Sequence, residues 1–146
     1  MAPGDEATRV GVNAFPIGGR MLMKHYFDGD EVFDRLQPYY NGTQYRFEVP
    51  AAEFDSLRRF LYERGYDVGV VDRLEPYYVA VPQYSEHPGG IFKSSVHHQA
   101  VDGYNCFLLA DRDAVEAAVR EGATRLTNVS LELRSQQLSA FATSAP

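Results

Sequence analysis

The residues best suited to chemistry lie close together between positions 97 and 104. His97 and His98 are adjacent, and Asp102 and Tyr104 complete a set of titratable groups within eight residues. A cluster of this kind could serve a small enzyme or a ligand-binding domain. Neighbouring side chains of a strand point to opposite faces, however, so in that conformation the two histidines could not share one metal ion.

Cys106 is a second possible reactive centre, because a cysteine near histidine can act as a nucleophile. It is the only cysteine of the chain and lies in the apolar run Asn105-Cys106-Phe107-Leu108-Leu109. A reactive thiolate requires partial exposure and a nearby cation, and the neighbouring sequence supplies neither. We therefore expect a buried, unreactive thiol. No histidine spacing is typical of zinc sites either, so the sequence predicts no catalytic residue, no metal site and no cofactor.

Tyrosine is the unusual residue type, with ten in 146 residues and no tryptophan. Exposed tyrosines favour interfaces because they give a large contact area at a low cost in side-chain entropy. Two tyrosine pairs end the near-repeats DRLQPYY and DRLEPYY, whose flanks differ, as chance or convergent turn chemistry would produce. In extended backbone, one ring of each pair should enter the core and the other should point outward.

These residues give the predicted binding set. Packing of the tyrosines at the boundary of the core, with hydrated hydroxyl groups, is the alternative. The predicted binding residues are Tyr39, Tyr40, Tyr77, Tyr78, His97 and His98.

Charge and composition restrict the partners. The net charge of −6 and the pI near 5.1 disfavour nucleic acid, because no basic stretch is long enough to track phosphates. Twelve arginines accompany only two lysines, Lys24 and Lys93, a bias that a GC-rich genome or growth in high salt would produce. The sequence has neither a membrane-spanning apolar run nor a signal-peptide pattern, so we expect a cytoplasmic protein with no membrane partner.

The clearest predicted element is a helix over residues 51–64. Phe54, Leu57 and Leu61 recur there at helical spacing, and Gly65 follows at the position of a left-handed C-cap.

A second helix is expected at 112–121 after the N-cap residue Asp111, and a short one at 31–37 after Asp30. Residues 91–101 fit either a strand or a helix. Apolar alternation or apolar runs predict strands at 43–49, 68–71, 77–81, 105–110 and 125–133.

The order of these elements predicts an α+β fold. A β-α-β-β-α-β series closes naturally as a ferredoxin-like two-layer sandwich, with both long helices on one face of a four-stranded sheet and an extra short N-terminal helix. We expect a flexible N-terminal arm at 1–22, one domain at 23–134 and a flexible C-terminal tail at 135–146. The expected core comprises Phe47, Phe54, Leu57, Leu61, Phe107, Val115, Val119, Val129 and Leu131.

Two functions from different classes fit these residues. The surplus of tyrosine and the lack of a convergent catalytic set favour a non-enzymatic protein-interaction or assembly module, a subunit of a homo- or hetero-oligomer. The alternative is a small enzyme or ligand-binding domain that uses His97, His98, Asp102 and Tyr104.

Overall fold

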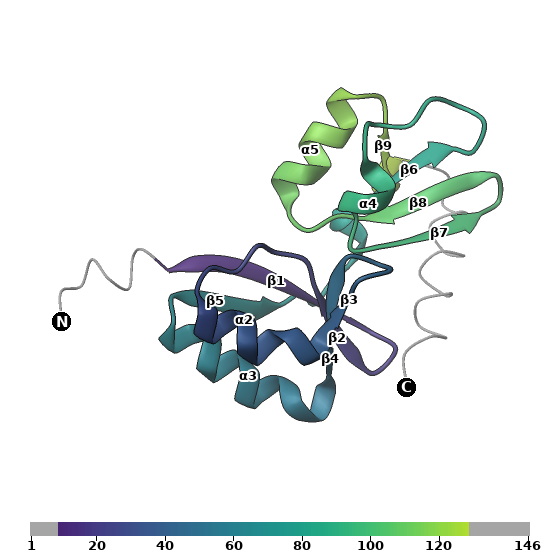
Figure 1. The fold of residues 1–146 in the computed structure, drawn as a ribbon. Helices are drawn as coiled ribbons and strands as arrows, with labels where there is room; N and C mark the ends of the chain where they lie inside the picture. Colours follow the sequence, from purple (N-terminus) through teal and green to yellow (C-terminus); the bar gives the residue numbers. More distant parts are fainter. Residues whose placement is uncertain (1–8, 129–146) are drawn as a thin grey trace.

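Two β-sheets pack against each other, and helices cover the outer face of each (Figure 1). The computed structural model describes residues 9–128. The first sheet and its helices comprise β1 (Val10–Ile17), β2 (Arg20–Met23), α2 (Asp30–Leu36), β3 (Tyr40–Asn41), β4 (Arg46–Pro50), α3 (Ala51–Glu63) and β5 (Tyr66–Val70). The second comprises β6 (Tyr78–Pro82), α4 (Ile91–Ser94), β7 (His97–Val101), β8 (Tyr104–Leu108), α5 (Arg112–Arg120) and β9 (Thr124–Arg125).

The strand order differs between the two sheets. The first sheet has the order β3-β4-β2-β1-β5, in which β1 and β5 are parallel and the other neighbours antiparallel. The second has the order β7-β8-β6-β9 and is antiparallel throughout. The element order β-α-β-β-α-β therefore occurs once in each sheet, from β2 to β5 and from β6 to β9, with β1 added to the first sheet.

Three apolar clusters separate these layers. The first lies between α2, α3 and the first sheet, and the third between α4, α5 and the second sheet. The middle cluster joins the inner faces of the two sheets, where Phe15 and Leu22 from the first meet Tyr78, Cys106 and Leu108 from the second. The fold is thus helix, sheet, sheet, helix, and the α+β class is confirmed.

The single ferredoxin-like sheet expected from the sequence is not the observed arrangement. The two long helices, α3 and α5, cover different sheets instead of one shared face. The strand at 77–81, β6, pairs with β8 and β9 and makes no ladder with the first sheet. Apolar spacing shows which face of a strand is buried but does not identify the strand that pairs with it. For this reason the sequence predicts one sheet where the structure has two.

Much of the expected N-terminal arm belongs to the first sheet. Residues 10–17 and 20–23 form β1 and β2, and β1 lies between β2 and β5. Val12 and Ala14 of β1 pack under the helices, whereas Phe15 packs against the other sheet. A strand that is covered on both faces lacks the alternation of apolar and polar residues that identifies strands in a sequence. For this reason the sequence analysis did not predict β1. Residues 1–8 and the expected tail at 135–146 lie outside the described residues.

The expected helix ends are mostly observed. The Asp111 side chain accepts a hydrogen bond of 2.7 Å from the Ala114 N–H, and Gly65 adopts φ +98° after α3. Asp30 was predicted to cap α2 but is instead its first residue, since Gly29 occupies the N-cap. The ambiguous segment at 91–101 contains both alternatives, the short helix α4 and the strand β7.

The two near-repeats adopt the same local structure. Each forms a 3-10 helix with proline at its start, at Gln37–Tyr39 and Glu75–Tyr77, and each then begins a strand at its last tyrosine. Those strands, β3 and β6, occupy different places in their sheets, so shared turn chemistry accounts for the likeness.

The predicted core is largely observed. Phe54, Leu57, Leu61, Phe107 and Val115 are buried, and Phe47 and Val119 pack partly buried against the same clusters. Val129 and Leu131 lie outside the described residues, as do residues 129–133 of the predicted last strand. The strand prediction is wrong for Leu126–Asn128, which form a 3-10 helix after the two-residue β9. None of the helices in residues 9–128 is long and apolar enough to cross a membrane.

Truncation of Leu61 should test the first helix–sheet layer. Leu61 is fully buried on the face of α3 that packs against the first sheet, so Leu61→Ala should lower the free energy of unfolding by about 2–5 kcal/mol. The matched control is Val10→Ala on the half-exposed β1 terminus, which should cost about 1 kcal/mol or less. Urea denaturation measures both, and equal losses in the two variants would contradict the packing.

Candidate ligand-binding groove

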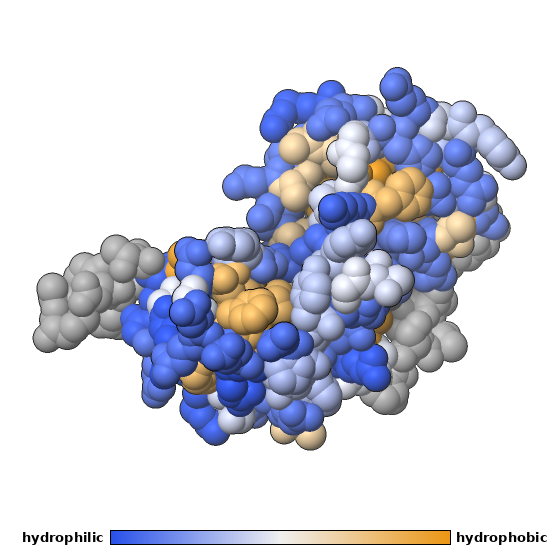
Figure 2. All heavy atoms as spheres, in the orientation of Figure 1, coloured by the Kyte–Doolittle hydropathy of each residue, from blue (hydrophilic) through white to orange (hydrophobic). Residues whose placement is uncertain are grey.

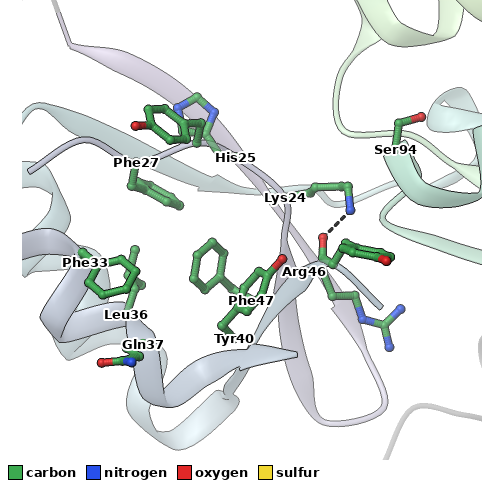
Figure 3. Close-up of a pocket in the computed structure, with 12 residues that line it drawn as sticks. Lys24, His25, Phe27, Phe33, Leu36, Gln37, Tyr40, Arg46, Phe47 and Ser94 are labelled. Carbon is green, nitrogen blue, oxygen red and sulfur yellow. Dashed lines mark hydrogen bonds between the residues drawn. The ribbon is translucent and has the colours of Figure 1, made fainter. Parts of the chain in front are cut away.

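An aromatic groove lies beside α2, at the edge of the first sheet. Its volume is about 720 Å³, within the range of small-molecule sites. Figure 2 shows hydrophobic side chains gathered over α2 and surrounded by hydrophilic ones. In Figure 3 the rings of the groove face one another at one end, with Lys24, Arg46 and Ser94 at the other. The aromatic and aliphatic side chains of the lining are Tyr26, Phe27, Phe33, Leu36, Tyr40, Tyr45 and Phe47.

Three local features position this lining. In α2, Val32 and Leu36 are buried against the first sheet, which leaves Phe33 on the adjoining face and 60% exposed. In β4, Phe47 faces the same side as the helices. Phe47 contacts the rings of Phe27 and Tyr40 edge to face, with centroid distances of 5.6 and 5.1 Å. Such pairs stabilise each other beyond their buried area, so the groove wall is ordered without a ligand.

Positive charge lies at the other end of the groove, from Lys24 in its lining and from Lys93, which is outside the lining but beside the lining residue Tyr45. Lys24 follows β2, and Lys93 belongs to α4 of the second sheet. Their ammonium groups lie 5.7 and 4.8 Å from the centre of the Tyr45 ring, and Lys24 Nζ also donates a hydrogen bond to the Tyr45 carbonyl. Burial, together with repulsion from Arg46 and Lys93, lowers the pKa of Lys24.

Tyr45 is held in an unusual backbone conformation. Its φ of +57° lies in the left-handed region, which costs a non-glycine residue roughly 1 kcal/mol or more. The preceding turn supports it, because the Asn41 side-chain oxygen accepts hydrogen bonds from the N–H groups of Thr43 and Gln44. This turn directs the Tyr45 carbonyl toward Lys24.

Arg46 connects the two sheets behind this end. Its guanidinium pairs with Glu48 at 2.8 Å, donates to the Val96 carbonyl at 2.9 Å and lies 3.2 Å from His97 Nδ1. Because arginine only donates, His97 Nδ1 accepts and the ring proton lies on Nε2. Burial opposes the ionisation of Glu48, but hydrogen bonds from Arg46 and Asn41 outweigh it and lower the pKa of this carboxyl group.

The predicted His97, His98, Asp102 and Tyr104 cluster is not assembled. His97 faces Arg46 between the sheets, whereas His98 faces the Phe92 and Phe107 rings on the helix side. His97 pairs with Leu108 at the far end of the hairpin from Asp102, which places them roughly 13–16 Å apart. Tyr104 packs against the cluster between the sheets. The histidines do point to opposite faces, as expected for a strand.

The four predicted tyrosines occupy different environments. Tyr40 is 48% exposed and lines the groove, and the partly buried Tyr39 donates its hydroxyl to Glu53 at 2.7 Å. Tyr78 is fully buried, and Tyr77 packs edge to face on Phe15 at 5.4 Å. An outward ring therefore exists at Tyr40 but not at Tyr78, because β6 is covered on both faces.

Cys106 is fully buried between the sheets, and burial raises the pKa of its thiol to about 11. The burial predicted from its apolar run is confirmed, and the low reactivity stays a prediction. Within residues 9–128, no three histidine, cysteine or carboxylate side chains gather as a metal site requires.

Sequence reasoning missed most of the groove. Of its lining, only Tyr40 was among the predicted binding residues. Lys24 and Lys93 were noted only as the two lysines of an arginine-rich chain, and this rarity was the available signal. Comparisons with protein-family models, curated proteins and solved structures give no match, so the proposals below rest on geometry and chemistry.

The partly buried position of His97 should make stability depend on pH. Burial, with repulsion from Arg46 and His98, lowers the pKa of His97 to about 4, below the value of 6.5 for an unfolded chain. Between about pH 6.5 and pH 4, His97 is therefore protonated in the unfolded state but neutral in the native state. The free energy of unfolding falls as the pH drops through this range. By pH 5 the His97 contribution should reach on the order of 1 kcal/mol after solvent screening.

Urea midpoints at pH 7 and pH 5 measure this effect. His97→Asn keeps an acceptor for Arg46 without a titratable ring, so its stability should fall less between the two pH values than that of the wild type. His98→Asn is the matched control, because His98 is more exposed. The same pH dependence in His97→Asn and the wild type would contradict the assignment.

Proposed function

We propose that this protein is a non-enzymatic binding domain that takes a small apolar ligand in the aromatic groove. The observation that carries this proposal is a hollow of about 720 Å³ whose lining includes seven phenylalanine, tyrosine and leucine side chains. Apolar surface of this kind is costly to leave in water, and its burial against a ligand is favourable. The separation of His97 and His98 from Asp102 supports a binding role over the catalytic alternative.

A second candidate is self-association through the same face. Around the groove Tyr26 is 82% exposed, Phe33 60% and Tyr40 48%, and exposed aromatic side chains are enriched at protein interfaces. This candidate retains the assembly role favoured by the sequence but moves its surface from both tyrosine pairs to Tyr40 and the residues beside it.

The ligand proposal predicts binding of a neutral apolar probe. N-phenyl-1-naphthylamine, whose fluorescence rises in apolar surroundings, should bind the wild type. Phe33→Ala should weaken that binding about fivefold or more, because an aromatic contact contributes about 1 kcal/mol. Phe33 is already 60% exposed, so its removal should leave the fold intact.

Tyr84→Ala is the matched control for this experiment. Tyr84 is 99% exposed and does not line the groove, so the variant should bind the probe as the wild type does. Equal titrations of wild type and Phe33→Ala, or no binding to the wild type, would overturn the ligand proposal. Circular dichroism of each variant verifies that it is folded.

Self-association has its own test by analytical ultracentrifugation. If the groove face joins two copies, the mass of the wild type should rise with concentration, and Tyr40→Ala should weaken the dimer about fivefold or more. Tyr84→Ala again serves as the control. A wild type that is monomeric at every concentration and salt level would remove this candidate and leave the ligand proposal unaffected.

A further inference from the structure

We propose that the ligand of the groove is a small amphipathic carboxylate, whose anionic head lies between Lys24 and Lys93 beside Tyr45 and whose apolar body fills the aromatic end. This inference rests on the proposed binding function and adds the charge and orientation of the ligand. Figure 3 shows the two ends of the groove, with Phe27 and Phe33 on one side and Lys24 with Ser94 toward the other.

The positive charge at this end is not balanced by a paired carboxylate within the described part of the chain. Arg20 and Arg46 both pair with Glu48, at 3.1 and 2.8 Å. Among residues 9–128 no carboxylate lies within 4.0 Å of Lys24 or Lys93. Glu48 is therefore shared by the two arginines, and neither lysine has a carboxylate partner among these residues, although the chain has a net charge of −6. His97 adds no positive charge near neutral pH, because its pKa is lowered to about 4.

The placement of the two lysines is also specific. They are the only lysines of the chain, they come from segments far apart in the sequence, and both lie over the ring of Tyr45. Repulsion between them opposes this arrangement and contributes to the lowered pKa of Lys24. An anion between the ammonium groups would replace that repulsion with attraction and would raise the pKa of Lys24.

The donors at this end match a carboxylate. The Arg46 guanidinium already contacts Glu48, Val96 and His97, so no free fork remains for the bidentate capture of a larger oxyanion. The donors that remain for a carboxylate are the ammonium groups of Lys24 and Lys93 beside Tyr45 and the Ser94 hydroxyl of the groove lining. The aromatic walls next to them favour a flat or aliphatic body attached to that head.

The experiment compares 1-pyrenebutyrate with its neutral amide by fluorescence anisotropy. The two probes share one apolar body and differ in the charge of the head. The wild type should bind the carboxylate about fivefold to tenfold more tightly than the amide, as expected for two partly exposed cations. This preference should shrink as the KCl concentration rises, because salt screens exposed charges.

Lys93→Gln and Lys24→Gln should each remove a severalfold part of the preference and leave the affinity for the amide within about twofold. Two variants are needed because Lys24 Nζ also donates a hydrogen bond to the Tyr45 carbonyl, so that its replacement changes a backbone contact as well as a charge. Arg58→Gln is the matched control, since it removes one exposed positive charge from α3 outside the groove, and it should keep the preference of the wild type.

Each outcome separates this inference from the proposed function. Equal affinity of the wild type for both probes overturns the carboxylate and leaves the groove as an apolar site. An unchanged preference in both lysine variants overturns the assignment of the head group to these lysines. Failure of both probes to bind the wild type, together with N-phenyl-1-naphthylamine, overturns the groove itself. A preference that is lost in the lysine variants and kept in Arg58→Gln supports the inference.

Discussion

The contact between the inner faces of the two sheets is the constraint on which the other features depend. Phe15, Tyr78 and Leu108 are fully buried there, and burial of large side chains from water is the dominant favourable term in folding. Two hydrogen bonds add to this contact. The Asn13 side-chain amide donates to the Ala110 carbonyl at 2.9 Å, and the Arg46 guanidinium donates to the Val96 carbonyl at the same distance. These bonds fix the lateral position of one sheet on the other.

The candidate site is a consequence of that position. Its aromatic wall belongs to the first sheet and α2, but Lys93 and Ser94 come from α4 of the second sheet. A shift of one sheet on the other would separate Lys93 from Tyr45 and leave an apolar hollow without its cationic end. Arg46 therefore has a positioning role, because it lies between the groove and the contact of the two sheets.

Local elements were predictable where one residue pattern dominates. The stripe of Phe54, Leu57 and Leu61 identified α3, and the Asp111 cap identified the start of α5. Burial of Cys106 also followed from its apolar neighbours. The missed strand β1 and the wrong sheet assignment of β6 have the same cause, because both strands are covered on both faces. Their side chains give no alternation from which a solvent face, and hence a sheet partner, could be deduced.

The sequence by itself determined the two long helices, several of the strands after residue 43, most of the core, and the opposite orientations of His97 and His98, because these follow from periods of 3.6 and 2 residues. Only the tertiary structure decided that two sheets form instead of one, because pairing depends on contacts between distant segments. It also decided that Lys24 and Lys93, 69 positions apart in the chain, meet over Tyr45 beside an aromatic groove. The spacing of residues along the chain cannot predict that the two lysines lie close together, because the packing of one sheet on the other brings them there.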